Sequence, residues 1–353
     1  MNAEDLNRYS RQIKLPGFGI SAQEKLQKAR VLIIGCGGLG SPISLYLAAA
    51  GVGTLGLVEF DNIDLSNLQR QIIFTSNQTG ESKLDATVIR LKELNPTITI
   101  EPHKAQISAK NALEIIDIYD VVVDGSDNFP TRYLINDACE ILNKPLVYGA
   151  IFQYEGQAAV FNLNGSATYR DMFPTPPPPE MAPNCAESGV LGSLAGIVGS
   201  IQANETIKII TGLGKPLSNQ LLLLDTLEMS FRKIKIKPDA ERQKPTSLID
   251  YDVFCGITSN SEIEISPEEF IEMKSQNDSF TLIDIREEYE HEAFNIGGIN
   301  IPMEEVLEQI DTFSGKIVFY CGSGQRAKAI AKKLRKSHNE DRFYALKGNL
   351  NLF

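Results

Sequence analysis

The chain lacks several residues and patterns that mark particular classes of protein. It has no tryptophan, three histidines and five cysteines in 353 residues. The cysteines are spread over positions 36, 139, 185, 255 and 321, which is not the arrangement of a disulfide framework. No apolar run is long enough to cross a membrane, and the N-terminus, Met1–Asp5, is too polar for a signal peptide. These absences predict a cytoplasmic protein whose thiols stay reduced.

Basic residues are scarce relative to acidic ones. The 34 Lys and Arg are outnumbered by 45 Asp and Glu, which gives a formal net charge of −11 at pH 7. A surface of this sign repels the phosphates of nucleic acids and of anionic lipids, so we expect neither a nucleic acid nor a membrane as partner. Apolar residues make up 42% of the chain and charged residues 22%, as in globular proteins. The length suits one large domain and a smaller one.

One glycine cluster organises the first half of the chain. Val31–Ile34 is a run of apolar, mostly β-branched residues that predicts a buried strand, and a helical pattern follows over Ser41–Val52. The turn between them fits G-x-G-x-x-G, and its glycines are Gly35, Gly37, Gly38 and Gly40. Such glycines let the backbone approach a ligand closely, and the N-terminus of the following helix favours a phosphate. By itself the motif predicts a phosphate-bearing ligand, with a dinucleotide as the default.

The segments that follow alternate between strand and helix. Strands are expected at 54–61, 97–101, 121–124 and 145–148, and helices at 82–94, 111–118 and 128–142. This alternation predicts a Rossmann-like, mainly parallel α/β sheet with helices on both faces. Further strands, which we expect to form an antiparallel extension of the sheet, are predicted at 157–162, 220–227 and 229–236.

A polar, irregular stretch separates this part from a second, smaller α/β unit. It contains Pro238 and Pro245 and has no sustained periodicity. We therefore expect a nucleotide-binding domain at 1–237, a linker at 238–261 and a small α/β domain at 262–353. In the small domain, an apolar strand runs into Cys321, and a helix is expected from Gln325. The Cys-Gly-Ser-Gly turn between them predicts a second glycine-rich cradle for an anion.

Charged residues near the strand ends decide which nucleotide is expected. Glu59 ends the second strand, where a dinucleotide fold holds a ribose hydroxyl, so at this point NAD and ATP are both open. Arg70 lies beyond that strand, Lys83 opens the next helix, and Asp127 follows the fourth strand. Arg70 and Lys83 can neutralise a triphosphate and Asp127 can hold magnesium, none of which a nicotinamide site requires. The pattern favours ATP with magnesium and nucleotidyl transfer.

These motifs together resemble the ubiquitin-activating-enzyme superfamily. They are Gly35-x-Gly37-Gly38-x-Gly40, Ser66-Asn67-Leu68-Gln69-Arg70-Gln71, Lys83 and Asp127-Asn128. Within the superfamily, the stretch Leu6–Ile236 is similar to the molybdopterin-synthase and thiamine sulfur-carrier adenylyltransferases. The resemblance implies adenylation of the C-terminal Gly-Gly carboxylate of a ubiquitin-fold sulfur carrier, with release of pyrophosphate. Besides the glycine turn, it implies nucleotide contacts from Glu59, Asp61, Ser66, Asn67, Arg70, Lys83, Asp127 and Asn128.

The same resemblance implies a homodimer. Arg11 would then reach the phosphates from the partner subunit. Together with Arg70, Lys83 and the magnesium at Asp127, it would offset the charge of the departing pyrophosphate. Catalysis would rest on positioning and on charge stabilisation.

Cys185 is a candidate for covalent chemistry. It lies between a Pro-rich segment at 174–183 and an expected helix, which is the setting of an activated thiol. The resemblance implies that the matching cysteine can take the activated carrier in a covalent link, and we favour this role over a structural one. Cys36 and Cys139 lie within expected elements and are predicted to be packed as apolar residues.

The chain differs from its relatives at the positions that bind zinc in them. They commonly carry two Cys-x-x-Cys pairs that bind zinc tetrahedrally. At those positions this chain has Thr168–Asp171 and Asp252–Cys255, so one thiol of the four remains. We expect no structural zinc, and we expect packing of the linker to replace it.

The C-terminal domain resembles a rhodanese. The resemblance is carried by Leu282–Glu287, by Gly297–Pro302 and by the loop Cys321-Gly322-Ser323-Gly324-Gln325-Arg326. A six-residue loop from Cys to Arg is the persulfide-carrying form of that family. Its backbone N–H groups and the following helix would lower the pKa of the thiol and stabilise a persulfide anion. Because Cys321 and Arg326 are both present, an active domain is favoured over a non-catalytic one.

Together these features predict an enzyme that adenylates a sulfur carrier and then sulfurates it. A Cys321 persulfide, charged by a donor such as a cysteine desulfurase, would give a C-terminal thiocarboxylate, with an acyl disulfide at Cys185 as one route. We expect the molybdopterin-synthase carrier and hence molybdenum cofactor biosynthesis, with the thiamine-pathway carrier as the alternative. Three other interpretations remain: activation of a tRNA-borne carboxylate, an NAD-dependent oxidoreductase, and an inactive interaction scaffold.

Overall fold

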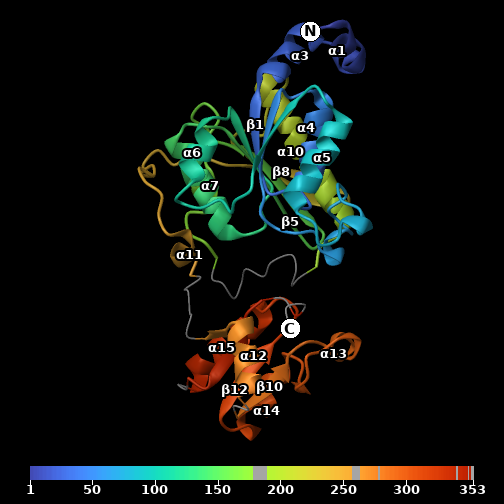
Figure 1. Ribbon diagram of the computed structural model, residues 1–353. Coiled ribbons are helices and arrows are strands. Elements are labelled where there is room, and N and C mark those ends of the chain that lie inside the picture. Colours follow the sequence, from blue (N-terminus) through green and yellow to red (C-terminus); the bar gives the residue numbers. More distant parts are fainter. Residues whose placement is uncertain (178–188, 257–262, 277–278, 339–340, 349, 351–353) are drawn as a thin grey trace. The chain divides into compact units, whose positions relative to one another are not determined.

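The structure is a computed structural model that describes residues 1–177, 189–256, 263–276, 279–338, 341–348 and 350 (Figure 1). The chain divides into two compact units, Met1–Ile257 and Thr258–Phe353. Each unit has its own β-sheet and its own buried core.

The first unit is built on an eight-stranded sheet with the order β3-β2-β1-β4-β5-β6-β7-β8. Its strands are β1 (Arg30–Ile34), β2 (Thr54–Val58), β3 (Thr99–His103), β4 (Val121–Asp124), β5 (Leu146–Phe152), β6 (Glu155–Phe161), β7 (Gln220–Asp225) and β8 (Ser230–Lys235). The first five strands pair in parallel, and β5 to β8 pair antiparallel. The predicted α/β fold with an antiparallel extension is thereby confirmed. Strand order reverses between β1 and β4, which is where such sheets bind ligands.

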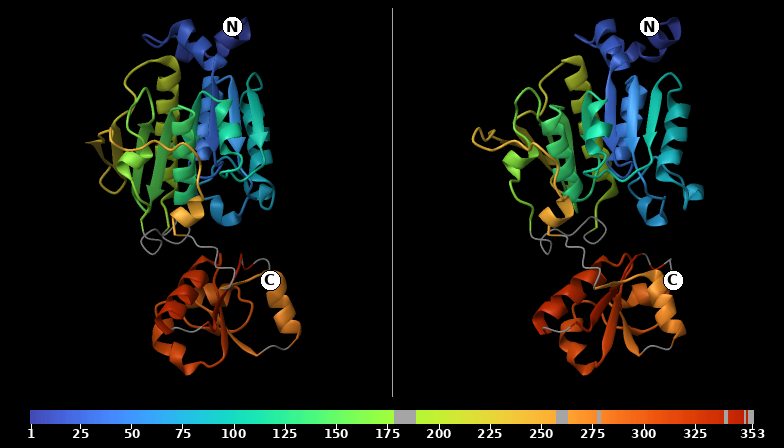
Figure 2. Two further views of the ribbon diagram at one scale, coloured as in Figure 1. Left: turned by 90° about the vertical axis from the view of Figure 1, so that its left-hand side faces the viewer. Right: turned by 60° about the vertical axis from the view of Figure 1, so that its left-hand side comes forward.

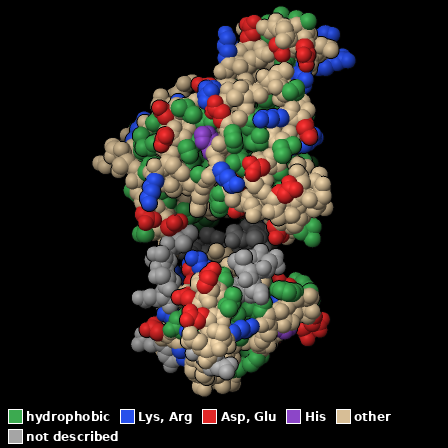
Figure 3. Space-filling view, in the orientation of Figure 1, with side chains coloured by type: hydrophobic (Ala, Val, Ile, Leu, Met, Phe, Trp, Pro, Cys, Tyr) green, Lys and Arg blue, Asp and Glu red, His purple; other side chains and the backbone are tan. Residues whose placement is uncertain are grey.

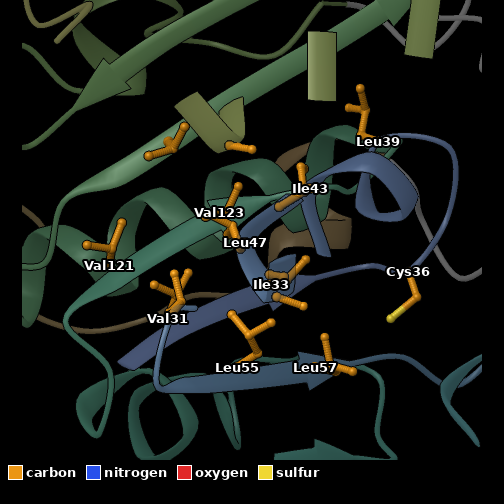
Figure 4. Close-up of a cluster of buried hydrophobic side chains, with 14 of the residues drawn as sticks. Val31, Ile33, Cys36, Leu39, Ile43, Leu47, Leu55, Leu57, Val121 and Val123 are labelled. Atoms are coloured by element: carbon orange, nitrogen blue, oxygen red, sulfur yellow. The ribbon is translucent and has the colours of Figure 1, made fainter. Parts of the chain in front are cut away.

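Helices cover both faces of this sheet (Figure 2). On one face lie α3 (Gly19–Lys28), α4 (Gly40–Ala50), α5 (Lys83–Leu94) and α10 (Gly192–Thr211). On the other lie α6 (Ala112–Asp117), α7 (Phe129–Ile141), α8 (Tyr169–Met172) and α11 (Tyr251–Phe254). Val31 and Ile33 of β1 point into the first core (Figure 4), whereas Leu32 and Ile34 point into the second, as strand geometry requires. The N-terminal residues form α1 (Ala3–Arg8) and α2 (Ser10–Ile13).

The first unit extends beyond residue 237, where we expected a linker to begin. Tyr251 is 5% exposed and belongs to the core that contains α6 and α7, and Phe254 packs against that core. The Tyr251 hydroxyl donates a hydrogen bond of 2.8 Å to Asp137 of α7. Because these contacts join residues more than a hundred positions apart, the irregular local pattern of 238–256 gave no sign of them.

The second unit is a small α/β domain with a five-stranded parallel sheet in the order β11-β10-β12-β13-β9. Its strands are β9 (Glu264–Ile265), β10 (Phe280–Asp284), β11 (Ile299–Asn300), β12 (Lys316–Tyr320) and β13 (Phe343–Leu346). Its helices are α12 (Pro267–Ser275), α13 (Glu288–Ala293), α14 (Val306–Gln309) and α15 (Gln325–His338). β10 and β12 are adjacent, and Cys321 follows β12 directly.

The surface carries charges of both signs. Acidic and basic side chains are interspersed on the visible face of each unit (Figure 3). Within the part of the chain that the structure describes, we find no helix with the length and apolar character needed to cross a bilayer.

Candidate active sites

A cleft opens in the first unit at the carboxyl ends of β1, β2 and β4. Most of the residues assigned to a nucleotide line it, namely Gly35, Gly37, Gly38, Glu59, Asp61, Arg70, Lys83, Asp127 and Asn128. Gly40, Ser66 and Asn67 are not among its lining residues; Ser66 and Asn67 belong to η1 (Leu65–Asn67), which precedes Arg70. Arg11 is exposed on α2 and is not part of the lining.

The glycine turn is so tight that two of its positions have no room for a side chain. A Cβ atom at Gly40 would lie 2.0 Å from the carbonyl oxygen of Gly35, and one at Gly35 would lie 2.9 Å from that of Gly125. Gly35 also has a φ of 90°, which glycine adopts readily. Gly37 and Gly38 line the cleft. The turn thus brings backbone N–H groups and the N-terminus of α4 to the cleft, where they can bind phosphate.

Glu59 has a larger structural role than the sequence suggested. Its carboxylate accepts the N–H groups of Cys36 at 2.9 Å, Phe60 at 2.8 Å and Asp61 at 3.0 Å. These bonds tie the end of β2 to the glycine turn, and they bend the backbone so that the strand ends at Val58 and not at residue 61. A carboxylate can accept about four hydrogen bonds, so capacity for a ribose hydroxyl remains.

Lys83 is held at the wall of the cleft. It is the first residue of α5, after the capping residue Ser82, and only 6% of its surface is exposed. Its ammonium group forms an ion pair of 3.2 Å with Asp61, whose side chain is half-exposed. A buried cation with one exposed partner is well placed to bind an incoming phosphate.

Arg70 and Gln71 follow η1 and line the same cleft. The Asn67 carbonyl accepts the N–H groups of both residues, so this turn sets where they point. The Arg70 guanidinium donates to the Ser66 carbonyl at 3.1 Å. Gln71 is 5% exposed, and its side-chain oxygen has no hydrogen-bond partner in the structure. That oxygen is an unused acceptor at the cleft, and a buried group of this kind is stabilised when a ligand donates to it.

The loop after β4 presents one buried and one exposed carboxylate. Asp124 is buried and accepts hydrogen bonds from the N–H and hydroxyl of Ser126, and its burial raises its pKa. Asp127 is exposed, and Asn128 caps α7 by accepting the N–H of Thr131.

An exposed carboxylate beside a phosphate cradle fits magnesium. Mg²⁺ is usually bound by one or two carboxylates together with substrate phosphates and water. Among the described residues, no three His, Cys, Asp or Glu side chains gather into a metal site, so Asp127 would need the phosphates as further ligands.

Arg132 lines the cleft and was missed by the sequence analysis. It lies in the first turns of α7, and its guanidinium stacks over Phe129 and Tyr148 at 5.5 and 5.8 Å from their centroids. Its Nε is buried without a hydrogen-bond partner in the structure. The only sequence signal was a basic residue shortly after Asp127, on the helix that begins there.

In the second unit, the residues of the predicted persulfide loop lie between β12 and the start of α15. Cys321 is 2% exposed, and Arg326 interacts with it while donating two hydrogen bonds to Glu290. Gly324 has a φ of 81°, and a Cβ there would lie 2.9 Å from the Leu346 carbonyl oxygen. The loop thus closes against β13 because glycine occupies this position.

The remaining cysteines differ in their surroundings. Cys36 and Cys139 are fully buried, and burial raises the pKa of each thiol, so both are neutral and unreactive at neutral pH. This agrees with their expected packing role. Cys185, the expected covalent thiol, lies outside the described residues.

The two segments at the expected zinc positions, Thr168–Asp171 and Asp252–Cys255, both lie against α7. Arg170 donates two hydrogen bonds of 2.7 Å to the carboxylate of Asp137 on that helix. Tyr251, the residue before the second segment, donates to the same carboxylate. The Asp137 carboxylate therefore links the first segment to the first residue of α11, the helix that contains most of the second segment.

Arg242 connects the same region to the stretch that precedes α11. Its guanidinium donates to Asp171 at 2.8 Å, to Glu140 at 2.7 Å and to the Thr168 hydroxyl at 2.9 Å. Burial raises the pKa of the remaining thiol, Cys255, to about 11. The Asp171 carboxylate and the Thr168 hydroxyl are already bound by Arg242, and only one thiol of the four is present, so these residues do not fit a tetrahedral zinc ion.

Two family models match the chain. Residues 9–246 match the ThiF family, and residues 266–353 match the rhodanese-like domain. The first match covers most of the first unit, which contains the cleft, and the second covers most of the second unit, which contains the Cys321 loop.

Curated relatives match over most of their own length. "Probable adenylyltransferase/sulfurtransferase MoeZ" of Mycobacterium tuberculosis is 39% identical over 97% of this chain and 91% of the relative. "Adenylyltransferase and sulfurtransferase MOCS3" of Anopheles gambiae is 42% identical over 87% of this chain and 74% of the relative. "Sulfur carrier protein adenylyltransferase" of Thermus thermophilus is 49% identical over 72% of this chain and 98% of the relative.

Among solved structures, E. coli MccB crystallised with AMPCPP and MccA has a similar fold. The TM-score is 0.61 at 21% identity, over 68% of this chain and 74% of that one. At this identity the likeness concerns the fold alone.

Proposed function

Because the chain belongs to the ThiF family and carries a rhodanese-like domain, we propose that it adenylates and then sulfurates the C-terminal Gly-Gly carboxylate of a ubiquitin-fold sulfur carrier. It is an enzyme of the adenylyltransferase and sulfurtransferase class, as the relatives that match it over most of their length are. The identity of the carrier is our proposal, supported by the name of the Thermus thermophilus relative.

The observation that carries the first step is the convergence of cations on one cleft. Arg70, Lys83 and Arg132 line the same cavity as the glycine turn and Asp127. An NAD-dependent oxidoreductase would not need three cations there, whereas the triphosphate of ATP carries the charge that they neutralise. The same intact set of phosphate-binding residues counts against an inactive scaffold.

The proposed reaction begins with attack by the carrier carboxylate on the α-phosphorus of ATP. The new bond joins the carboxylate oxygen to phosphorus, the bond to the bridging oxygen breaks, and pyrophosphate leaves with its electron pair. Lys83 and Arg70 would stabilise the charge that builds up on the leaving group. Magnesium, which Asp127 would hold, supplies further neutralisation of the phosphates. Glu59 would orient the ribose.

Sulfur transfer would then use the loop in the second unit. The terminal sulfur of a Cys321 persulfide attacks the acyl carbon and AMP leaves. Because the attacking sulfur is bonded to Cys321, the acyl disulfide joins the carrier to Cys321 and not, as first expected, to Cys185. A second thiol, for which we propose Cys185, attacks the Cys321 sulfur, forms a new disulfide and releases the thiocarboxylate. That disulfide must be reduced by cellular thiols before the next turnover.

Further details are also proposals. We propose an upstream persulfide donor such as a cysteine desulfurase, and a cytoplasmic location. We propose a homodimer in which Arg11, which is exposed and lies outside the cleft of its own subunit, reaches the cleft of a partner subunit. The molybdopterin-synthase carrier is favoured by the relatives named MOCS3, with the thiamine-pathway carrier as the alternative.

Pyrophosphate release tests the first step. The full chain, incubated with magnesium, ATP and a Gly-Gly carrier, should release pyrophosphate, and Lys83→Met should slow release on the order of 100-fold. Lys92→Met is the matched control, because Lys92 is exposed on the same helix. Equal rates for Lys83→Met and the wild type would contradict the proposed site.

A second comparison tests the division of labour. Cys321→Ala should leave pyrophosphate release unchanged and should abolish thiocarboxylate formation, as measured by mass spectrometry of the carrier. Equal loss of both activities would contradict separate sites for adenylation and sulfur transfer.

A further inference from the structure

Glu290 of α13 binds Arg326, the last residue of the Cys321 loop. Its two carboxylate oxygens accept N–H groups of the Arg326 guanidinium at 3.0 and 3.2 Å. A two-pronged pair of this kind fixes the plane of a guanidinium as well as its position. The two side chains are only partly exposed, at 26% for Glu290 and 32% for Arg326.

Glu290 is itself held in place by its own helix. One of its oxygens also accepts the N–H of Glu287 at 3.1 Å, and the Glu287 side chain completes a capping box at the start of α13. Burial by itself raises the pKa of Glu290, but the hydrogen bonds from Arg326 and Glu287 outweigh this and keep the pKa below its ordinary value. The carboxylate is therefore charged at neutral pH.

We propose that Glu290 is a positioning residue for sulfur transfer, which holds Arg326 so that its remaining N–H groups face the Cys321 sulfur. A guanidinium has five N–H donors, and Glu290 occupies two of them. Arg326 also interacts with Cys321. The inference rests on the proposed sulfurtransferase function of this unit, and it adds a residue to which the persulfide loop itself gives no clue.

Two roles of Glu290 predict opposite changes in the reactivity of Cys321 when Glu290 is removed. If Glu290 only screened the positive charge of Arg326, its removal would leave more charge beside Cys321 and make the thiol more reactive. If Glu290 positions Arg326, its removal lets a long and flexible side chain move away, and Cys321 loses a donor. The sign of the effect on Cys321 therefore separates the two roles.

The experiment measures sulfur transfer from thiosulfate to cyanide by the full chain. In this reaction the Cys321 thiolate attacks the outer sulfur of thiosulfate, the S–S bond breaks and sulfite leaves. Cyanide then takes the sulfur from the persulfide as thiocyanate, which restores the thiolate. Glu290→Gln should lower kcat/KM by about tenfold, mainly through KM for the anionic donor. Glu292→Gln, an exposed residue of the same helix, is the control and should have no effect.

A double-mutant comparison shows whether Glu290 acts through Arg326. Glu290→Gln should have no further effect when Arg326 is already alanine, because the group that it positions is gone. A further loss in that background would overturn the proposal, and so would wild-type activity of the single variant. Glu290→Asp should recover part of the activity, since it restores the charge with a shorter reach.

Alkylation of Cys321 gives a second readout that does not depend on turnover. Followed on the Cys321 peptide by mass spectrometry, alkylation by iodoacetamide should be slower in Glu290→Gln than in the wild type. Faster alkylation would overturn the proposal in favour of screening. If the wild-type chain transferred no sulfur, the proposed function would fail, whereas the alkylation rates would still decide the role of Glu290.

Discussion

Replacing Arg242 by methionine should destabilise the first unit by about 3 kcal/mol, which is at the lower end of the cost of breaking a buried ion pair. The variant keeps most of the side-chain volume and removes the guanidinium. Glu140 and Asp171 are then left without their partner, although their side chains are 1% and 3% exposed. The lower end of the range applies because the Arg242 side chain is 16% exposed, so water can partly replace it.

The assay must report on this region by itself, because a chain of two units need not unfold in one step. The chain also has no tryptophan to serve as a fluorescent probe. Hydrogen exchange measured by mass spectrometry on peptides from α7 and α8 meets both conditions. A loss of about 3 kcal/mol should speed exchange of their most protected amides on the order of 100-fold.

Two further variants test the reasoning. Lys244→Met, which changes an exposed cation two residues away, should leave exchange unchanged. Combining Arg242→Met with Glu140→Gln and Asp171→Asn should restore much of the protection, because no buried charge is then left unpaired. Exchange in Arg242→Met within about twofold of the wild type would refute the idea that this network holds 238–256 on α7.

Further predictions concern the cleft, the second unit and the metal content. Arg132→Met should lower the rate of carrier-dependent pyrophosphate release about tenfold, because a cation that can donate to the phosphates is lost from the cleft. Gly40→Ala should destabilise the first unit by about 3 kcal/mol in urea unfolding, since its Cβ would lie 2.0 Å from a backbone oxygen. In the second unit, burial raises the pKa of Asp284, but hydrogen bonds from Arg286 and His291 outweigh it and hold the pKa below its ordinary value. The stability that this provides is present above about pH 4 and is lost as the pH falls through the folded-state pKa, so hydrogen exchange in β10 should lose this pH dependence in Asp284→Asn. Metal analysis of the purified protein should find no stoichiometric zinc, and chelators should leave its stability unchanged.

The local pattern of the sequence was enough to predict the elements around the cleft. The strand before Gly35, the glycine turn and the helix after it depend on neighbours in the chain, through apolar periodicity and through the backbone freedom of glycine. The helix was expected from Ser41 and begins at Gly40. The loop from Cys321 to Arg326 was predictable for the same reason, because strand, turn and helix follow one another directly.

Other features depended on contacts that no local pattern records. The strand after Gly53 ends at Val58, because the Glu59 carboxylate binds the next two N–H groups and bends the chain. Arg132 faces the cleft only because α7 packs with that side toward it.

The sequence by itself determined which residues form the nucleotide motifs and the persulfide loop, because those residues are held together by the chain that links them. Only the tertiary structure decided what takes the place of the zinc ligands and what holds Arg326. Arg242 binds Glu140 across 102 positions, and Glu290 binds Arg326 across 36. Such pairs form because folding brings two charges together out of water, and neither residue's neighbours in the sequence carry a sign of its partner.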